Sequence, residues 1–308
     1  MVDQITASHE CPACGATLSN GEFDVSGICH RCAGYDYLSP PPSEATTDAP
    51  AAQPSDPDHP PWGPGVGIGV WIASIAAIIV IPVLAVGLWL FIAWVRGAPL
   101  PNFADKEELE QWVLSPNILL LQLMATMAAQ LVTVALCWAV VTKLGSRPFW
   151  ATLGSGWGGR PIWYWVAFSA CLLVALELLS RVLLRFLPQT DSPFDQMLRV
   201  SQSVRITVAV LATFTAPLAE EIVYRGVLFS ALRKSIGLTA TVPVVTLTFA
   251  GVHVFQNRGA WVSMTGLTLL SLALTLVRAR TKSVLPCIVI HTFNNAIASL
   301  AILLNKGS

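Results

Sequence analysis

Seven apolar stretches, the first long enough to cross about 30 Å of hydrocarbon as a helix and the fifth shorter, occupy most of this chain. An ordinary soluble domain could not bury so much apolar sequence, since 54% of the residues are hydrophobic, 12% are charged and the mean hydropathy is +0.62. The sequence therefore predicts an all-α polytopic membrane protein of about seven transmembrane helices. The predicted spans are residues 67–95, 117–143, 162–187, 204–230, 239–256, 261–277 and 284–304.

The orientation of these spans follows from Lys and Arg in the short loops, which are enriched on the cytoplasmic side. With a cytoplasmic N-terminus, the inside loops carry eight such residues and the outside loops carry six. This bias favours a multi-pass protein of the cell membrane with its N-terminus in the cytoplasm. The inside set is Lys143, Arg147, Arg160, Arg233, Lys234, Arg278, Arg280 and Lys282.

The N-terminal residues contain two CxxC pairs, Cys11 with Cys14 and Cys29 with Cys32. Four thiolates at this spacing can converge tetrahedrally on Zn²⁺, so we predict a zinc ribbon over residues 1–37 that precedes the membrane helices. The alternative is two disulfides in an exported domain. It is less favoured because residues 1–10 have neither the basic nor the apolar part of an export signal.

The ribbon and the sequence after it are acidic. Residues 1–60 hold nine acidic side chains against a single Arg31, so a nucleic-acid phosphate backbone would be repelled and no nucleic-acid partner is expected. A structural role in folding or in binding a protein partner is the better prediction for the ribbon. Residues 38–66 are rich in Pro, Ser and Asp, which is typical of a disordered linker, and the transmembrane domain then covers residues 67–304.

The fourth predicted span contains the stretch APLAEEIVYRG, which places two glutamates and an arginine at membrane depth. Glu221 and Arg225 are four residues apart, so they share a helix face and can form a buried ion pair. Glu220 points about 100° away and has no such partner. Because an ionisable group in the bilayer costs roughly 2.5 to 3.5 kcal/mol, an unpaired Glu220 indicates a function.

Two further spans carry the other candidate residues. Phe249 and His253 lie four apart in FAGVH, and His291 and Asn295 lie four apart in HTFNN. Either histidine alone would more often be a hydrogen-bonded packing residue. Together with Glu220 they favour a site that holds a water molecule, with a carboxylate to take its proton, imidazoles to polarise it or bind a metal, and an amide to donate to an oxyanion.

These three motifs, EEIVYR, FAGVH and HTFNN, resemble in order and spacing the EExxxR, FxxxH and HxxxN/D motifs of the CPBP intramembrane protease family. The family is named for CAAX proteases and bacteriocin-processing enzymes and is also called the abortive-infection family. The resemblance covers about residues 204–304. It implies a helical membrane core around a water-accessible chamber, and a protease that cuts a membrane-anchored or lipidated peptide or protein.

By motif position, the resemblance implies that Glu220 activates the hydrolytic water together with His253. It gives His291 and Asn295 the role of stabilising the tetrahedral oxyanion or sharing in metal binding. The family is generally called metalloprotease, so the resemblance also leaves open a divalent metal held by His253 and His291.

The remaining motif residues have supporting roles by the same resemblance. Glu221 and Arg225 would brace the site, and Phe249 would be a further supporting residue.

Two other classes of protein stay open at this point. A non-catalytic member of the same fold, acting as a membrane scaffold or as an immunity or regulatory protein, would keep the helices without needing the site. A proton-coupled transporter would also place Glu and His within its spans, although this chain shows no two halves with matching broken helices. In each case membrane lipid surrounds the protein.

Overall fold

The computed structural model describes residues 8–19, 23, 28–30, 32, 56–188 and 190–304. The chain divides into two compact units, Met1–Gln53 and Pro54–Ser308. Part of the predicted ribbon and most of the predicted linker, residues 38–55, therefore lie outside the described residues.

The first unit contains a short antiparallel hairpin. Strand β1 (Ser8–Glu10) pairs with β2 (Thr17–Ser19), with His9 opposite Leu18. Gly15 in the connecting turn has φ +74°, a conformation that favours glycine, and it brings the chain back from Cys11 toward β2.

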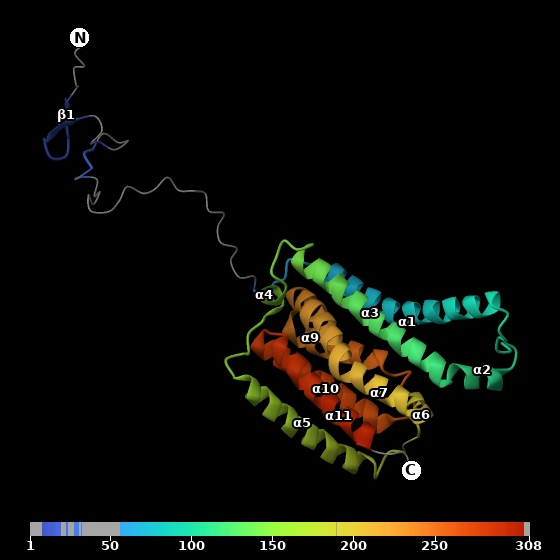
Figure 1. Cartoon of the computed structure of the whole chain (residues 1–308). Helices are drawn as coiled ribbons and strands as arrows, with labels where there is room; N and C mark the ends of the chain where they lie inside the picture. The colour runs from blue at the N-terminus through green and yellow to red at the C-terminus, as the bar shows by residue number, and fades with distance from the viewer. Residues whose placement is uncertain are drawn as a thin grey trace. The chain divides into compact units, whose positions relative to one another are not determined.

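The second unit is helical, with one long bundle in which α1 packs on α3, and α11 packs on both α5 and α10 (Figure 1). Two of its segments, η2 and η3, are π-helical and flank α8. The elements are α1 (Pro64–Val95), α2 (Lys106–Val113), α3 (Pro116–Thr142), α4 (Phe149–Leu153), α5 (Ile162–Leu183), α6 (Pro193–Val200), α7 (Gln202–Val210), η2 (Leu211–Thr215), α8 (Ala216–Glu221), η3 (Ile222–Leu228), α9 (Phe229–Val252), α10 (Trp261–Thr281) and α11 (Leu285–Leu304).

Six helices among the described residues are long and apolar enough to cross a membrane, whereas the sequence predicts seven spans. The difference lies in the spans expected at 204–230 and 239–256, because they belong to one helical stretch, Gln202–Val252, of 51 residues. No polar loop separates them. The chain breaks instead at Gly237, whose φ of +73° and ψ of 173° are non-helical.

The break at Gly237 sets the depth of the candidate residues. Glu220 lies 17 residues before it and His253 lies 16 residues after it, and each helical residue rises about 1.5 Å. The returning arm packs along the outgoing one, since the Phe249 and Tyr224 rings are 5.1 Å apart. The hairpin therefore brings Glu220 and His253 to nearly the same level of the bundle.

The distribution of apolar and charged side chains between the surface and the interior is the one expected of a membrane protein. Large apolar side chains are exposed along α1, α3 and α5, where lipid would cover them, whereas several charged side chains are fully buried inside the bundle. The largest cluster of buried apolar residues centres on η3. It includes Val227 within η3 and Phe229, the first residue after it. The core of the bundle thus holds the segment that follows the two glutamates.

Candidate active site

The two glutamates lie on α8, between the π-helical turns of η2 and η3. Pro217 near the start of α8 has no backbone N–H to donate, so it interrupts the regular hydrogen-bond ladder there. Single π-helical turns inside an α-helix occur frequently at functional sites, because they re-aim side chains without ending the helix.

Glu221 and Arg225 form the ion pair that their spacing predicts. Arg225 Nη1 donates to Glu221 Oε1 over 2.9 Å, and both side chains are fully buried. Arg225 Nη2 donates to Ser271 Oγ over 2.8 Å, and the guanidinium lies 4.7 Å from the centre of the Phe249 ring. Arg225 therefore links α10 to both the glutamate and the aromatic residue of the second motif.

His291 lies between the two glutamates. Its Nδ1–H donates to Glu221 Oε1 over 2.7 Å, which fixes the ring orientation and leaves Nε2 free. Nε2 is 3.8 Å from Glu220 Oε2. The side chain of Glu220 is 24% exposed and that of His291 is 5% exposed, so the carboxylate of Glu220 is the more accessible of the two groups.

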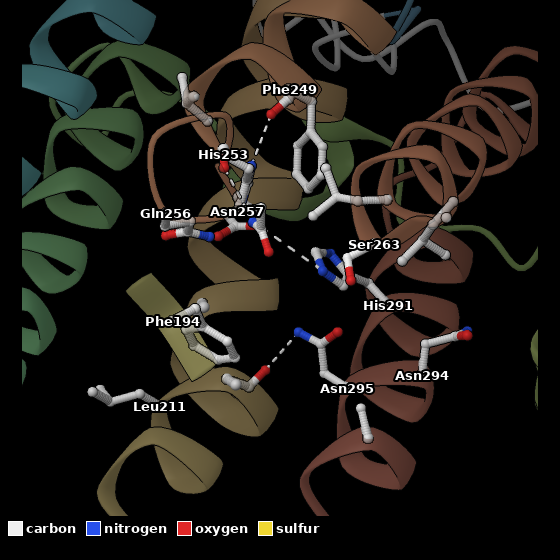
Figure 2. Close-up of a pocket in the computed structure, with 18 of the residues that line it drawn as sticks. Phe194, Leu211, Phe249, His253, Gln256, Asn257, Ser263, His291, Asn294 and Asn295 are labelled. Atoms are coloured by element: carbon white, nitrogen blue, oxygen red, sulfur yellow. Dashed lines mark hydrogen bonds and ion pairs between the residues drawn. The ribbon is translucent and has the colours of Figure 1, made fainter. Parts of the chain in front are cut away.

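His253 ends the returning arm of α9. Its Nδ1–H donates to the carbonyl oxygen of Phe249 over 2.8 Å, and the two rings are 4.9 Å apart (Figure 2). The bond to the carbonyl requires a proton on Nδ1, so in the neutral ring Nε2 is an acceptor. Asn257 Nδ2 donates to the His253 carbonyl oxygen over 3.1 Å and holds the end of the helix.

Asn295 reaches across from α11 to η2, where its Nδ2 donates to the Ala212 carbonyl oxygen over 2.8 Å (Figure 2). This bond uses one of the two amide protons and leaves the other for a ligand. The neighbouring Asn294 differs, because its Nδ2 donates to Ser169 Oγ over 2.6 Å and to the Ile290 carbonyl oxygen over 2.9 Å. Asn294 joins α11 to α5 and has no amide proton to spare.

One open cavity of about 1510 Å³ brings the candidate residues together (Figure 2). Glu220, His253, His291 and Asn295 all line it, from α8, the end of α9, and α11. The structure thus gathers residues that are far apart in the sequence, while their roles in a reaction stay predictions.

The cavity also contains residues that the motifs did not single out as site residues. Trp71 on α1 and Tyr224 on η3 both line it, and Trp71 Nε1 donates to the Tyr224 hydroxyl oxygen over 3.2 Å. The Tyr224 O–H therefore remains available as a donor. Tyr224 lies inside EEIVYR, so its position in the motif was a usable signal, whereas nothing in the sequence connects Trp71 with it.

Four sulfur atoms in the first unit form the group best suited to a metal. The ligand atoms of Cys11, Cys14, Cys29 and Cys32 all lie within 4.8 Å of one another. The Cys29 N–H donates to Cys11 Sγ over 3.2 Å, and this bond lowers the pKa of the Cys11 thiol to about 6. Such a tetrathiolate set could bind a metal ion.

The intramembrane residues are arranged differently. Among the residues that the structure describes, Glu220, His253 and His291 do not form a group whose ligand atoms meet within that distance. The donor atoms left free are the Nε2 atoms of the two histidines and the Glu220 carboxylate. A divalent metal at this site stays a prediction, and these side chains are not arranged in advance to share one ion.

Part of the chain matches a known protein-family model. Residues 202–297 match the family described as Rce1-like, type II CAAX prenyl endopeptidase Rce1-like. The matched range contains all seven residues of the three intramembrane motifs. Comparisons with curated proteins and with solved structures gave no significant match.

Proposed function

We propose that this chain, whose residues 202–297 match the model of the Rce1-like type II CAAX prenyl endopeptidases, is an intramembrane endopeptidase that uses Glu220 to activate water. One observation carries the proposal. Glu220 lines the cavity 3.8 Å from His291 Nε2, and the other nitrogen of that ring is held by the buried Glu221. One accessible carboxylate is therefore free to move protons, while its neighbour is fixed.

The proposed reaction begins with a water molecule at Glu220. The Glu220 carboxylate takes a proton as the water oxygen attacks the carbonyl carbon of the scissile peptide bond. The Nε2 atom of His253 or His291 can accept a hydrogen bond from that water and orient it. The carbonyl π bond breaks and leaves a tetrahedral intermediate with negative charge on the former carbonyl oxygen.

The oxyanion needs donors that are already in place. The free amide proton of Asn295 and the hydroxyl of Tyr224 are two such donors on the cavity wall. The carbon–nitrogen bond then breaks, and the leaving amine takes the proton that Glu220 holds. The products are a carboxylic acid and an amine, which become a carboxylate and an ammonium when the acid passes its proton to the amine, and Glu220 returns to its starting state.

The shape and lining of the cavity support a substrate that is tethered to the membrane. Apolar residues from α1 and α3, such as Ile78 and Leu123, line it together with the polar site residues. A lipidated peptide could place its hydrocarbon against them and its peptide bond at Glu220. The prenylated CAAX terminus named in the family description is the first substrate to test.

We further propose that Zn²⁺ occupies the four cysteines of the ribbon, because a tetrathiolate site in a reducing compartment is typical of structural zinc. The ribbon would then be a folded module for a protein partner.

If a divalent metal also binds in the membrane, Glu220 and the Nε2 atoms of His253 and His291 would hold it, and it would supply Lewis-acid polarisation of the water or the carbonyl.

The test is cleavage of a prenylated reporter peptide by purified wild-type protein and by Glu220→Ala, compared at equal membrane accumulation. We expect the variant to lose at least about 100-fold in rate. Glu177→Ala is the matched control, because Glu177 is another carboxylate on the cavity wall, is paired with Arg181 and belongs to none of the three motifs. Its rate should stay within about twofold of wild type.

An unchanged rate in Glu220→Ala would overturn the hydrolase mechanism. The non-catalytic scaffold would then be favoured, and it should still assemble in the membrane without cleaving any reporter. Substrate uptake into sealed vesicles that depends on a proton gradient would instead support the transporter.

A further inference from the structure

Residues 56–62, here called the strap, lie directly before α1 and are held against the bundle through one carboxylate. Asp58 is only 2% exposed. Its Oδ1 accepts from Arg278 Nη1 over 3.1 Å, and its Oδ2 lies 3.2 Å from Arg233 Nη2 and 3.5 Å from Lys282 Nζ. Because the Arg278 side chain is fully buried, Asp58 supplies the counter-charge that offsets its desolvation.

Three hydrogen bonds also join the strap to the bundle. Arg278 Nη2 donates to the Pro57 carbonyl oxygen over 3.1 Å, and Lys234 Nζ donates to the Pro60 carbonyl oxygen over 3.3 Å. At the other end, Trp62 Nε1 donates to the Val227 carbonyl oxygen over 3.1 Å. The strap is therefore fixed to α9 and α10 and in turn contacts η3.

The segment that it contacts is the π-helical turn that follows Glu221. Two carbonyl oxygens of η3 accept hydrogen bonds from side chains outside it: Arg225 O accepts from Arg278 Nε over 3.0 Å, and Val227 O accepts from Trp62 Nε1. Buried carbonyl groups need such donors wherever the regular helical ladder changes. Both donors depend on the strap, because Asp58 orients Arg278 and Trp62 belongs to the strap.

We propose that Asp58 is a positioning residue for the reaction and that the strap holds the π-helical turn in the geometry that aims Glu220 and Glu221. The chain of contacts is short. Asp58 holds Arg278, Arg278 holds the backbone of Arg225, and the side chain of Arg225 holds Glu221, to which His291 is bonded. This inference rests on the proposed function, since the readout is hydrolysis.

The experiment compares Asp58→Asn with Asp56→Asn in the full chain and measures kcat and KM on the prenylated reporter. Asp56 is the matched control because it also belongs to the strap and lies 3.6 Å from Lys282, yet it is half exposed and does not contact Arg278 in the described structure. We expect Asp58→Asn to lower kcat about tenfold with KM changed less than about threefold, because small displacements of a catalytic group are costly. Asp56→Asn should stay within about twofold, and Asp58→Glu should recover most of the rate.

A second pair of variants covers the case in which Asp58→Asn fails to fold. Trp62→Phe keeps an aromatic ring and every ion pair of the strap but removes the indole N–H that donates to Val227 O. Arg278→Lys keeps the positive charge beside Asp58 but removes the Nε–H that donates to Arg225 O. Each should lower kcat at least about threefold, with faster amide hydrogen exchange across η3. Folded variants with full kcat and unchanged exchange in η3 would overturn the proposal.

The outcomes also separate this inference from the proposed function. If Glu220→Ala is inactive while folded Asp58→Asn and Trp62→Phe keep full kcat, the hydrolase stands and the positioning role of the strap is wrong. If Glu220→Ala cleaves at the wild-type rate, the proposed function fails, and the positioning role of Asp58 in the reaction fails with it even where exchange in η3 rises.

Discussion

The ring of His291 joins two carboxylates of opposite accessibility, with Nδ1 2.7 Å from the fully buried Glu221 and Nε2 3.8 Å from the cavity-lining Glu220. Glu221 is also the partner of Arg225, so a single buried oxygen, Glu221 Oε1, accepts from both side chains. The fixed glutamate orients the histidine, and the histidine in turn faces the glutamate that we propose to be the base.

Glu221→Gln should therefore destabilise the protein strongly. The amide keeps the shape of the carboxylate but leaves Arg225 as an uncompensated buried charge, at a cost of about 3 to 5 kcal/mol. The measurement is thermal unfolding in detergent. Glu177→Gln is the control, because the Glu177–Arg181 pair is exposed and such pairs contribute at most about 1 kcal/mol.

The paired replacement Glu221→Leu with Arg225→Leu separates folding from activity. Removing both charges should recover much of the lost stability, since no buried charge is left alone. The rate should stay low because His291 has lost the acceptor that orients it. A double variant as unstable as Glu221→Gln would contradict this account of the pair.

Tyr224→Phe should lower kcat about tenfold with little change in stability. The ring keeps its packing against Phe249, but the substitution removes the hydroxyl that we assign to the oxyanion. The measurement is kcat on the reporter, with Trp71→Phe as a companion, because it removes the donor to that hydroxyl but leaves the hydroxyl itself. A rate unchanged by Tyr224→Phe would remove Tyr224 from the mechanism.

Local spacing in the sequence was enough to predict contacts within one helix. The Glu221–Arg225 pair follows from a separation of four residues, and the candidate spans follow from the length of the apolar runs. The bond from His291 to Glu221 could not be predicted in this way, since it depends on how α11 meets α8 across 70 residues of sequence.

The strap shows a second limit of reading the sequence by composition. A segment rich in Pro, Ser and Asp is interpreted as linker because it cannot form a core of its own. Asp58 is buried nevertheless, because three cations from α9, α10 and the residue after α10 surround it. The boundary between the spans predicted at 204–230 and 239–256 is a break at Gly237 within one helical stretch rather than a loop, and composition alone does not predict that geometry.

Gly67→Ala should destabilise the contact between α1 and the first turn of α9. A Cβ at Gly67 would lie 2.5 Å from the Ala231 Cβ, so the two helices would have to separate, at a cost of about 1 to 3 kcal/mol. Gly69→Ala is the control because its Cβ would meet nothing within 4 Å, and alanine is the better helix former by about 1 kcal/mol. Thermal unfolding should shift down for Gly67→Ala and stay level or rise for Gly69→Ala.

The cytoplasmic orientation of the N-terminus can be tested by labelling. Ser146 and Arg258 are exposed residues in the loops that follow α3 and α9, and each can be replaced by a single cysteine. The orientation predicted from basic residues puts the two positions on opposite sides of the membrane. In intact cells a membrane-impermeant thiol reagent should label Arg258→Cys and leave Ser146→Cys unlabelled, in a background without native cysteines. The reverse pattern would place the ribbon outside the cell.

Zinc binding to the ribbon should weaken as the pH falls, and more steeply below about pH 6. Metal binding requires thiolates, so each thiol that is protonated in the free protein must release its proton. The pKa of Cys11 is lowered to about 6, chiefly by the Cys29 N–H, which favours the thiolate form of this sulfur near neutral pH. The pKa of Cys32 is raised to about 12, chiefly by its hydrogen bond with Cys14, so its proton must be displaced at any pH between 6 and 8.

Affinity should therefore fall with decreasing pH across that range, and Cys11 adds a further proton to the competition below pH 6. The measurement is a zinc titration of the reduced full-length protein against a chelator at pH 5 to 8. Cys11→Ser should abolish stoichiometric zinc, whereas Cys171→Ser, in α5, should leave one zinc bound. An affinity that does not change with pH, or zinc retained by Cys11→Ser, would contradict a tetrathiolate site.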